Sequence, residues 1–325
     1  MASAFLALDL GGTKCAAILG RLGETYDVLG KRVFPTTSLG TPQDALATLG
    51  NALAELSAQH GIQAEAIGIS CGNPMNARQG IVLSPPNMPG WDNVPVVQTL
   101  MARFGIPARL MNDANAGCLA EARFGAAQGY RHAVFLTMGT GMGAGLILNG
   151  SLYEGASGSG GEVGHMRLFP EGPVGYGKRG SFEGFCSGGG IAQMARQRAF
   201  EAMQTGKPLA WCTAPEHLAP LTTKQVAEAA HAGDGDARAV FAEAGMWLGR
   251  GLALILDAIN PEVVAIGGVY PRCRGLLEES MRAILAAEAL PDVYAACAIV
   301  PAQLGEAIGD VAALCVAETA RQESI

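Results

Sequence analysis

A run of small residues near the middle of the chain constrains its fold most. Thr137-Met138-Gly139-Thr140-Gly141-Met142-Gly143-Ala144-Gly145 lies between two apolar runs, Ala133 to Leu136 and Leu146 to Leu148. Glycines pack poorly in a core and lose the most backbone entropy on folding. They do let the backbone approach a ligand closely, with N–H groups free to point at phosphate oxygens. We therefore predict a phosphate-binding loop that includes Thr137, Gly139, Thr140 and Gly141.

The letters Gly139-x-Gly141-x-x-Ala144 also fit the dinucleotide-binding fingerprint. That fingerprint requires a helix directly after the loop. Here the loop is followed by Leu146-Ile147-Leu148 and then by Asn149-Gly150, which predicts a strand that enters a tight hairpin turn. The context therefore favours a strand–loop–strand unit over a Rossmann site.

A second unit of the same design begins the chain. Phe5-Leu6-Ala7-Leu8 predicts a short strand, Asp9-Leu10-Gly11-Gly12-Thr13-Lys14 a glycine turn, and Cys15 to Leu19 a second strand. Two such units predict two similar halves, each with a phosphate loop. Because Asp9 lies at a strand end beside its loop, it is well placed to hold Mg²⁺, directly or through water. We expect the first loop to use Gly11, Gly12, Thr13 and Lys14.

Composition narrows the class of protein. A chain of 325 residues, with 49% hydrophobic and 16% charged residues, is long enough for about two globular domains. A net charge of −7 without a Lys/Arg block argues against a nucleic-acid partner. No secretory signal or membrane-spanning run is evident, and the eight cysteines stand singly without CxxC pairs. We expect a cytoplasmic protein with reduced thiols and no membrane partner.

Predicted strands and helices alternate along the chain, so the expected fold class is α/β. A proline-rich stretch, Val82 to Trp91, is too apolar for a linker, and we place a domain boundary near Asn112. The further strands expected are 26–34, 66–70, 108–111, 263–266 and 296–300. The helices expected are 42–60, 113–124, 187–205, 224–232, 236–260 and 306–321.

Asp113 follows an apolar strand and opens a helix. Most aspartates at such positions cap the helix N-terminus. A strand end in an open α/β sheet is also where ligands collect, and Asn112 and Asn115 flank this residue. Asp113 is therefore either a helix cap or a functional carboxylate.

Glu162 and His165 stand among glycines in Gly160-Gly161-Glu162-Val163-Gly164-His165. With so little to pack against, both side chains favour contact with a ligand. Together with Glu183 they suit a metal ion as three ligands. The same carboxylates equally suit a polyol, whose hydroxyls would donate to them. The local pattern leaves both interpretations open.

The motifs together resemble the ROK family of sugar kinases and regulators (repressor, open reading frame, kinase), within the actin/hexokinase-like superfamily. The resemblance spans nearly the whole chain, with the motifs in family order. They are Asp9-Leu-Gly-Gly-Thr-Lys14, Pro86-Asn-Met-Pro-Gly-Trp91, Asn112-Asp-Ala-Asn115, Gly139-Thr-Gly-Met-Gly143, Gly161-Glu-Val-Gly-His165 and Ile266-Gly-Gly268.

The resemblance implies a two-lobed actin-like, ribonuclease H-like fold with a ligand cleft between the lobes. It implies a small lobe over 1–112, completed by a helix over about 305–325, and a large lobe over 113–304. It also implies transfer of the ATP γ-phosphoryl group to a hexose hydroxyl, with O6 of glucose expected, and a homodimer. The implied base is Asp113, the adenosine-side glycines are Gly267 and Gly268, and the implied sugar contacts are Gly72, Asn73, Asn112, Asp113, Glu162, His165 and Glu183.

One departure from the family pattern matters. The three cysteine positions of the family's zinc-binding stretch are Val174, Tyr176 and Ser181 here. Because three of four tetrahedral ligands are therefore missing, we expect no structural zinc and leave His165 as a sugar contact only. Tyr176 and Phe182 are expected to pack this loop through apolar contacts.

Other functions stay open. Asn73-Pro74-Met75-Asn76 differs from the corresponding stretch of glucose-specific relatives, so fructose, mannose, allose and N-acetylhexosamines such as N-acetylmannosamine remain alternatives to glucose. A sugar-sensing regulator is disfavoured by the acidic charge and by the lack of a DNA-binding segment. A non-catalytic sugar-binding protein is disfavoured because Asp113 and both glycine loops are intact.

Overall fold

Two five-stranded sheets of similar topology organise the chain in the computed structural model, which describes residues 2–324. The strand order in the first sheet is β3-β2-β1-β4-β7, and in the second it is β10-β9-β8-β13-β14. Each sheet begins with an antiparallel hairpin around a glycine turn and continues with parallel strands. The prediction of two similar halves is confirmed.

The strands have the following bounds. The first sheet contains β1 (Ser3–Leu10), β2 (Lys14–Leu22), β3 (Tyr26–Pro35), β4 (Ile67–Cys71) and β7 (Ala108–Asn112). The second contains β8 (Ala133–Met138), β9 (Met142–Leu148), β10 (Ser151–Leu152), β13 (Val263–Ile266) and β14 (Ala298–Pro301). Two small hairpins pair β5 (Met75–Asn76) with β6 (Ile81–Val82), and β11 (Val174–Gly175) with β12 (Lys178–Arg179).

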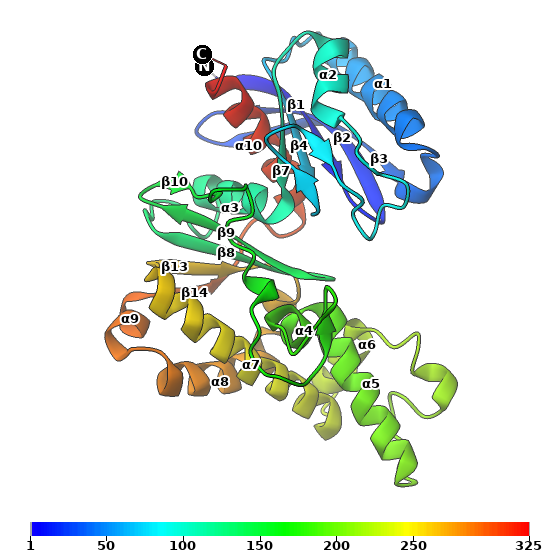
Figure 1. Ribbon diagram of the computed structural model, residues 1–325, viewed down its shortest axis with the longest axis vertical. Coiled ribbons are helices and arrows are strands. Elements are labelled where there is room, and N and C mark those ends of the chain that lie inside the picture. Colours follow the sequence, from blue (N-terminus) through cyan, green and yellow to red (C-terminus); the bar gives the residue numbers. More distant parts are fainter. Residues whose placement is uncertain (1, 325) are drawn as a thin grey trace.

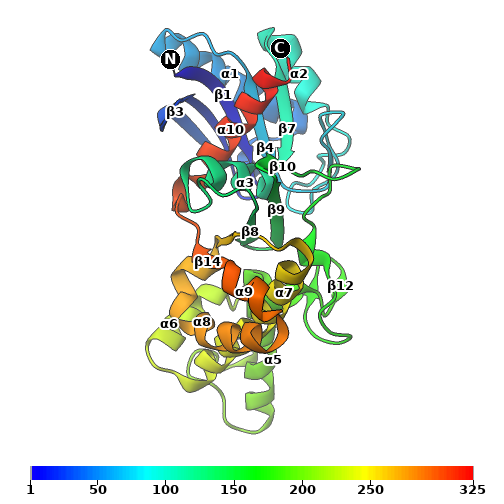
Figure 2. The same ribbon diagram turned by 90° about the vertical axis from the view of Figure 1, so that its left-hand side faces the viewer.

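Helices cover both faces of both sheets (Figures 1 and 2). The outer face of the first sheet carries α1 (Pro42–His60) and α2 (Val96–Phe104). Between the sheets lie α3 (Asp113–Phe124) and α10 (Ile308–Gln322). The outer side of the second sheet carries α4 (Phe182–Cys186), α5 (Gly188–Gln204), α6 (Thr223–His231), α7 (Gly235–Ile259), α8 (Val269–Glu288) and α9 (Pro291–Ala296).

The alternation of side chains along each strand builds these layers. In β1, Leu6, Leu8 and Leu10 join the outer core with α1, while Phe5 and Ala7 face α10. In β8 the even-numbered positions likewise join the outer core and the odd-numbered positions face α3. Strands buried on both faces read as continuous apolar runs, which is why the sequence signalled them clearly.

The two inner helices approach the sheets at backbone contact. A Cβ at Gly68 of β4 would lie 1.9 Å from the carbonyl oxygen of Ala313 in α10. A Cβ at Gly145 of β9 would lie 2.4 Å from Cβ of Cys118 in α3. Glycine is therefore required at both contacts, because any side chain would push the helix away from its sheet.

Most predicted elements are confirmed within a few residues, but α2, α4, α8 and α9 were missed. α8 begins directly after the glycine turn and contains Pro271 and Gly275, both poor helix formers. Pro271 lies in the first turn, where its missing N–H needs no intrahelical partner, so the helix tolerates it. The strand predicted from Ala296 begins at Ala298, because Ala296 still belongs to α9.

The expectation that the sequence has no run apolar enough to span a membrane is wrong for one described helix. By length and composition, α7 (Gly235–Ile259) could cross a membrane, since an 18-residue window of it has a mean hydropathy of 1.4. In the structure 61% of that 18-residue window is buried. Its apolar side packs in the outer core of the second sheet, as expected for the core helix of a globular domain.

We propose the lobe division that the family resemblance implies, at 1–112 and 113–304 with about 305–325 returning to the first lobe. The first sheet ends with β7 at Asn112, and α10 packs on β1, β4 and β7. The chain therefore returns to its first sheet at its C-terminal end, and both described ends lie near that sheet in Figure 1.

We predict that Gly68→Ala lowers the free energy of unfolding by about 2–4 kcal/mol, since its Cβ must displace backbone atoms of α10. Gly275→Ala in α8 is the matched control, because its Cβ would meet open space, and we expect a gain of about 0.5–1 kcal/mol. Urea unfolding of both variants measures this. An unchanged midpoint for Gly68→Ala would contradict the close approach of α10.

Candidate active site

The candidate site lies where three parallel strands end. The register of β1, β4 and β7 pairs Asp9 with Ser70, and Cys71 with Asn112. The residues that follow these strands, Gly72 and Asn73 after β4 and Asp113 after β7, therefore leave the sheet at one edge. Ligands collect at the carboxyl ends of parallel strands in open α/β sheets. The topology thus brings five of the predicted site positions to one edge of the sheet, namely Asp9, Gly72, Asn73, Asn112 and Asp113.

Asn112, not Asp113, is the N-cap of α3. Its Oδ1 accepts hydrogen bonds from the backbone N–H groups of Ala114 at 2.9 Å and Asn115 at 3.3 Å. Asp113 is the first helical residue, and its Oδ1 accepts from Ala114 N–H at 2.8 Å. The interpretation of Asp113 as the cap is therefore wrong. Asp113 keeps an exposed surface at the strand edge, and its carboxylate is available for chemistry.

The surroundings hold the pKa of the Asp113 carboxyl at about 6. The main cause is desolvation by the protein around it, opposed by the Ala114 N–H bond, and the negative charges of Asp9 and Glu162 raise the pKa further. Burial likewise raises the pKa of Asp9, with a contribution from Asp310, while Lys31 and Lys14 lower it. Several carboxylates thus share one electrostatic environment, as in sites tuned for proton transfer or cation binding.

Glu162 comes to this edge from the second half of the chain. Its Oε1 accepts a hydrogen bond from Nδ2 of Asn73 at 2.6 Å. The loop that carries it packs on β9, where a Cβ at Gly161 would lie 2.2 Å from the carbonyl oxygen of Ala144. The glycines therefore seat the loop on the sheet and leave Glu162 to face the first half.

His165 and Glu183 flank Glu162 in different ways. His165 lies on the short 3-10 turn Val163–His165 and is exposed. Glu183 lies in the first turn of α4, and its Oε2 accepts from Met142 N–H, beside the second glycine loop, at 2.9 Å. Among residues 2–324, no three His, Cys, Asp or Glu side chains are grouped as metal ligands, so the structure does not assemble the metal triad considered above.

The first glycine turn is closed by a Gly11 N–H bond to the carbonyl oxygen of Lys14 at 3.1 Å. Gly12 lies against Asn87, where a Cβ would be 2.3 Å from the Asn87 Cβ. Asn87 comes from the proline-rich loop, which Met88 and Trp91 anchor in the core. Asn87 belongs to one of the motifs of the family resemblance but was not among the predicted site residues. Thr13 and Lys14 are exposed beside it.

The second glycine loop borders a cavity of about 420 Å³. Gly139 N–H bonds to the carbonyl oxygen of Gly141 at 2.9 Å, and the Gly139 carbonyl oxygen accepts from Gly188 N–H at 2.7 Å. Gly268 also lines the cavity, whereas Gly267 is buried against Phe135. Most of the lining was not predicted from the sequence, namely Gly188, Gly189, Ala192, Arg196, Leu221, Thr222, Thr223, Lys224, Val269 and Arg272.

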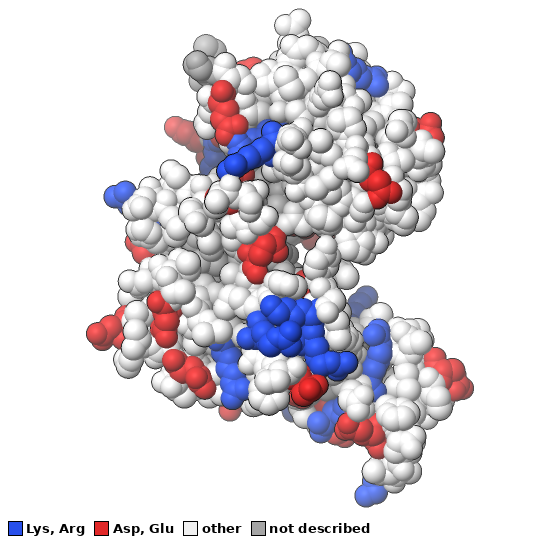
Figure 3. Space-filling view, in the orientation of Figure 1, with Lys and Arg blue, Asp and Glu red and all other residues white. Residues whose placement is uncertain are grey.

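The segment 165–181 is ordered by hydrogen bonds to backbone carbonyls. Lys178 Nζ donates to the carbonyl oxygen of His165 at 2.7 Å, and Arg167 Nη1 to that of Arg179 at 2.9 Å. Figure 3 shows a cluster of Lys and Arg side chains over the part of the molecule that carries α4 in Figure 1. Phe182 is fully buried as expected, but Tyr176 is 63% exposed, so its predicted packing role is wrong.

The residues present fit a nucleoside triphosphate with a divalent cation. Glycine loops offer backbone N–H groups, and Arg196, Lys224 and Arg272 line the cavity beside one of them. Asp9 has no ion pair among residues 2–324, and its pKa is raised, so a bound cation would relieve its unfavourable charge. Oxygen ligands of this kind are those that Mg²⁺ prefers.

Comparison with known proteins places this geometry in a family. The model of the ROK family matches residues 5–320. A glucokinase from Thermotoga maritima is 31% identical over 305 residues, 94% of each chain. An N-acetylmannosamine kinase from Salmonella typhimurium is 33% identical over 289 residues, 88% of this chain and 89% of the relative.

Solved structures agree on the fold. The ROK hexokinase from Thermus thermophilus superposes with a TM-score of 0.80 at 30% identity, covering 98% of this chain and 99% of that one. A ROK glucokinase from Streptomyces griseus, in complex with glucose and AMPPNP, gives 0.77 at 29% identity, covering 98% and 100%. A ROK transcriptional regulator, a homologue of the E. coli MLC protein, gives 0.83 at 26% identity, covering 98% of this chain and 78% of that one.

The raised pKa of Asp113 makes stability depend on pH. The folded chain holds this proton with a pKa of about 6, well above the ordinary value of 3.8, so ionised Asp113 destabilises the fold above about pH 6. We predict that Asp113→Asn is more stable than the wild type at pH 8, by about 1 kcal/mol after allowance for solvent screening. Below about pH 4 the carboxyl is protonated in both states, so the difference disappears.

Thermal unfolding at pH 4, 6 and 8 measures this difference. Asp27→Asn, at an exposed carboxylate on β3, serves as the control and should show no such pH-dependent gain. An Asp113→Asn variant less stable than the wild type at pH 8 would contradict the electrostatic description of the site.

Proposed function

Because the chain belongs to the ROK family, we propose that it is an ATP-dependent hexose kinase, with O6 of glucose as the expected phosphoryl acceptor. The observation that carries the proposal is the position of Asp113. Its carboxylate stands at the edge where β1, β4 and β7 end, within electrostatic reach of Asp9 on one side and Glu162 on the other. Glucokinases among the relatives support glucose as the first candidate.

In the proposed reaction, Asp113 accepts the proton of the attacking sugar hydroxyl. With a pKa of about 6 it is ionised at neutral pH and is a stronger base than an ordinary aspartate. The Ala114 N–H bond fixes one carboxylate oxygen and leaves the other for the substrate. Positioning and electrostatics provide most of the catalysis in phosphoryl transfer, so this fixed geometry matters more than strong basicity.

We assign sugar binding to residues from both halves of the chain, namely Gly72, Asn73, Asn112, Glu162, His165 and Glu183. Asn73 and Glu162 already contact each other across the site, so hydroxyls placed between them would find both a donor and an acceptor. A bound sugar would cover these groups, and a covered polar group left without its partner is costly, so these contacts would reject analogues that lack the matching hydroxyl.

We assign nucleotide binding to the two glycine loops. The first loop contributes Asp9, Gly11, Gly12, Thr13 and Lys14. The second loop and the glycine turn after β13 contribute Thr137, Gly139, Thr140, Gly141, Gly267 and Gly268. The cavity beside Gly139 and Gly268 has room and cations for the nucleotide. When bound, Mg²⁺ would neutralise phosphate charge, and Asp9 is the residue proposed to hold it. We also propose that the protein acts in the cytoplasm as a homodimer.

Two further candidates have observations in their favour. The N-acetylmannosamine kinases among the relatives support an N-acetylhexosamine substrate. The regulator among the structural neighbours supports a sugar sensor. Fructose, mannose and allose are further hexoses to test. The electrostatically tuned Asp113 favours a catalyst over a sensor.

We predict ADP formation that depends on a hexose, with glucose giving the highest kcat/KM among glucose, mannose, fructose, allose and N-acetylmannosamine. Asp113→Asn should lower kcat by about 100-fold or more, the usual size of a general-base contribution. A coupled ATP-to-ADP assay measures both. If no hexose stimulates turnover while a sugar still raises the melting temperature of both forms, the kinase proposal falls and the sensor takes its place.

We predict that kcat/KM declines as the pH falls through about 6, because protonation of Asp113 removes the base. Glu162→Gln removes a negative charge that raises this pKa but keeps the amide oxygen that accepts from Asn73. Its acidic limb should therefore move to lower pH, by about half a unit. Glu216→Gln, on the exposed surface, is the control, and a limb unmoved by Glu162→Gln would contradict this.

A further inference from the structure

The segment from Glu154 to Glu162 carries a proposed sugar contact but has little side-chain packing of its own. It contains Gly155, Gly158, Gly160 and Gly161. Its backbone is closed by Gly160 N–H, which donates to the carbonyl oxygen of Glu154 at 2.8 Å. A segment so rich in glycine has high backbone freedom, so contacts must fix its position. The carbonyl oxygen of Gly161 accepts from Ala144 N–H of β9 at 3.1 Å, and side-chain contacts hold the two ends of the segment.

Both ends are tied to the first sheet by side chains. At the start of the segment, Glu154 Oε2 accepts from Arg109 Nη2 of β7 at 2.7 Å. At its end, Glu162 Oε1 accepts from Asn73 Nδ2 at 2.6 Å. The segment itself leads out of β10 of the second sheet. The two hydrogen bonds therefore join the two halves of the molecule, one at each end of the segment 154–162.

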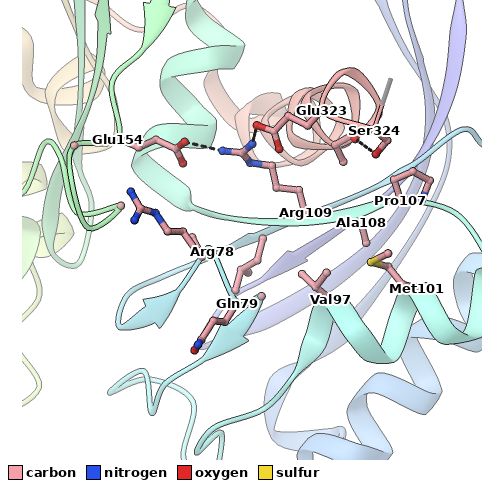
Figure 4. Close-up of a pocket in the computed structure, with 16 residues that line it drawn as sticks. Arg78, Gln79, Val97, Met101, Pro107, Ala108, Arg109, Glu154, Glu323 and Ser324 are labelled. Atoms are coloured by element: carbon pink, nitrogen blue, oxygen red, sulfur yellow. Dashed lines mark hydrogen bonds and ion pairs between the residues drawn. The ribbon is translucent and has the colours of Figure 1, made fainter.

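Arg109 is a firm anchor for this contact. Its side chain is only 16% exposed, and its Nη1 pairs with Glu323, just beyond α10. It lies on β7, the strand that ends at Asn112 just before Asp113, and Figure 4 shows it between Glu154 and Glu323. A charge-assisted bond to a fixed, largely buried guanidinium is stronger than an ordinary surface ion pair.

A cavity of about 480 Å³ surrounds this ion pair. It is lined by the turn that follows β5, by the start of β7 and by Gly155 and Gly158 of the segment. Arg78 also lines it and has no hydrogen-bond or ion-pair partner among residues 2–324. The cavity borders Gly155 and Gly158, so this part of the segment has room to move once Glu154 is released.

We propose that the Arg109–Glu154 ion pair is a latch that positions the segment 154–162, and with it Glu162, against the bound sugar. The inference rests on the proposed hexose kinase function and assigns Arg109 and Glu154 as positioning residues. Because they lie outside the reacting groups, their loss should weaken sugar binding and leave the chemical step nearly unchanged.

The test compares two carboxylates that share Arg109. Glu154→Gln should raise KM for the sugar about fivefold to twentyfold, with kcat within about twofold and KM for ATP unchanged. Glu323→Gln removes the other partner of Arg109 without touching the segment and should leave KM for the sugar within about twofold. Arg78→Gln, the other cation of the cavity, should behave in the same way. Arg109→Gln combined with Glu154→Gln should be no worse than the worse of the two single variants.

A second readout needs no catalysis. Hydrogen exchange at the Gly160 amide, without sugar, should be faster in Glu154→Gln and unchanged in Glu323→Gln. Equal exchange in the wild type and Glu154→Gln, or equal effects of Glu154→Gln and Glu323→Gln on KM, would overturn the latch. If the wild type phosphorylates no hexose, the proposed function fails, and the exchange measurement still decides the latch.

Discussion

The backbone contact of α3 and α10 with the two sheets is the constraint on which the site depends. Gly68 and Gly145 remove the side chains that would separate these layers. The same packing brings Gly309, in α10, so close that its Cβ would lie 2.7 Å from Oδ2 of Asp9. It also sets the first turn of α3, which begins at Asp113, at the strand edge. Core packing and site geometry therefore have one cause.

That packing concentrates negative charge at the strand edge. Desolvation is the main cause of the raised pKa of both Asp9 and Asp113; the charge of Asp310 adds to it at Asp9, and the charges of Asp9 and Glu162 add to it at Asp113. Lys31 offsets part of it by pairing with Asp310 at 2.6 Å. A cation or a hydroxyl donor that binds here would offset the desolvation and the repulsion between these carboxylates. The electrostatic cost of the empty site therefore favours binding of such a ligand.

Sequence patterns could predict the features that depend on residues close together in the chain. Both strand–glycine turn–strand units and the capping box of α1 are local, and the structure contains them. Whether Asn112 or Asp113 caps α3 depends on the backbone angles at Asn112, and the spacing of residues in the sequence does not predict those angles. The cavity residues Arg196, Lys224 and Arg272 come from three different helices or their caps, so no motif announces them. The Asn73–Glu162 and Arg109–Glu154 contacts likewise join residues distant in sequence.

The segment 165–181 shows how hydrogen bonds can order a loop at positions where the family pattern has metal-binding cysteines. At the three positions where the family resemblance places cysteines, each residue has a local environment of its own. The backbone of Val174 is bonded at both N–H and C=O by Gln193, at 3.0 and 2.8 Å. Ser181 is fully buried as the N-cap of α4, and Tyr176 points outward. Since Lys178 also fixes the carbonyl of His165, these bonds position the His165 backbone beside the proposed sugar site.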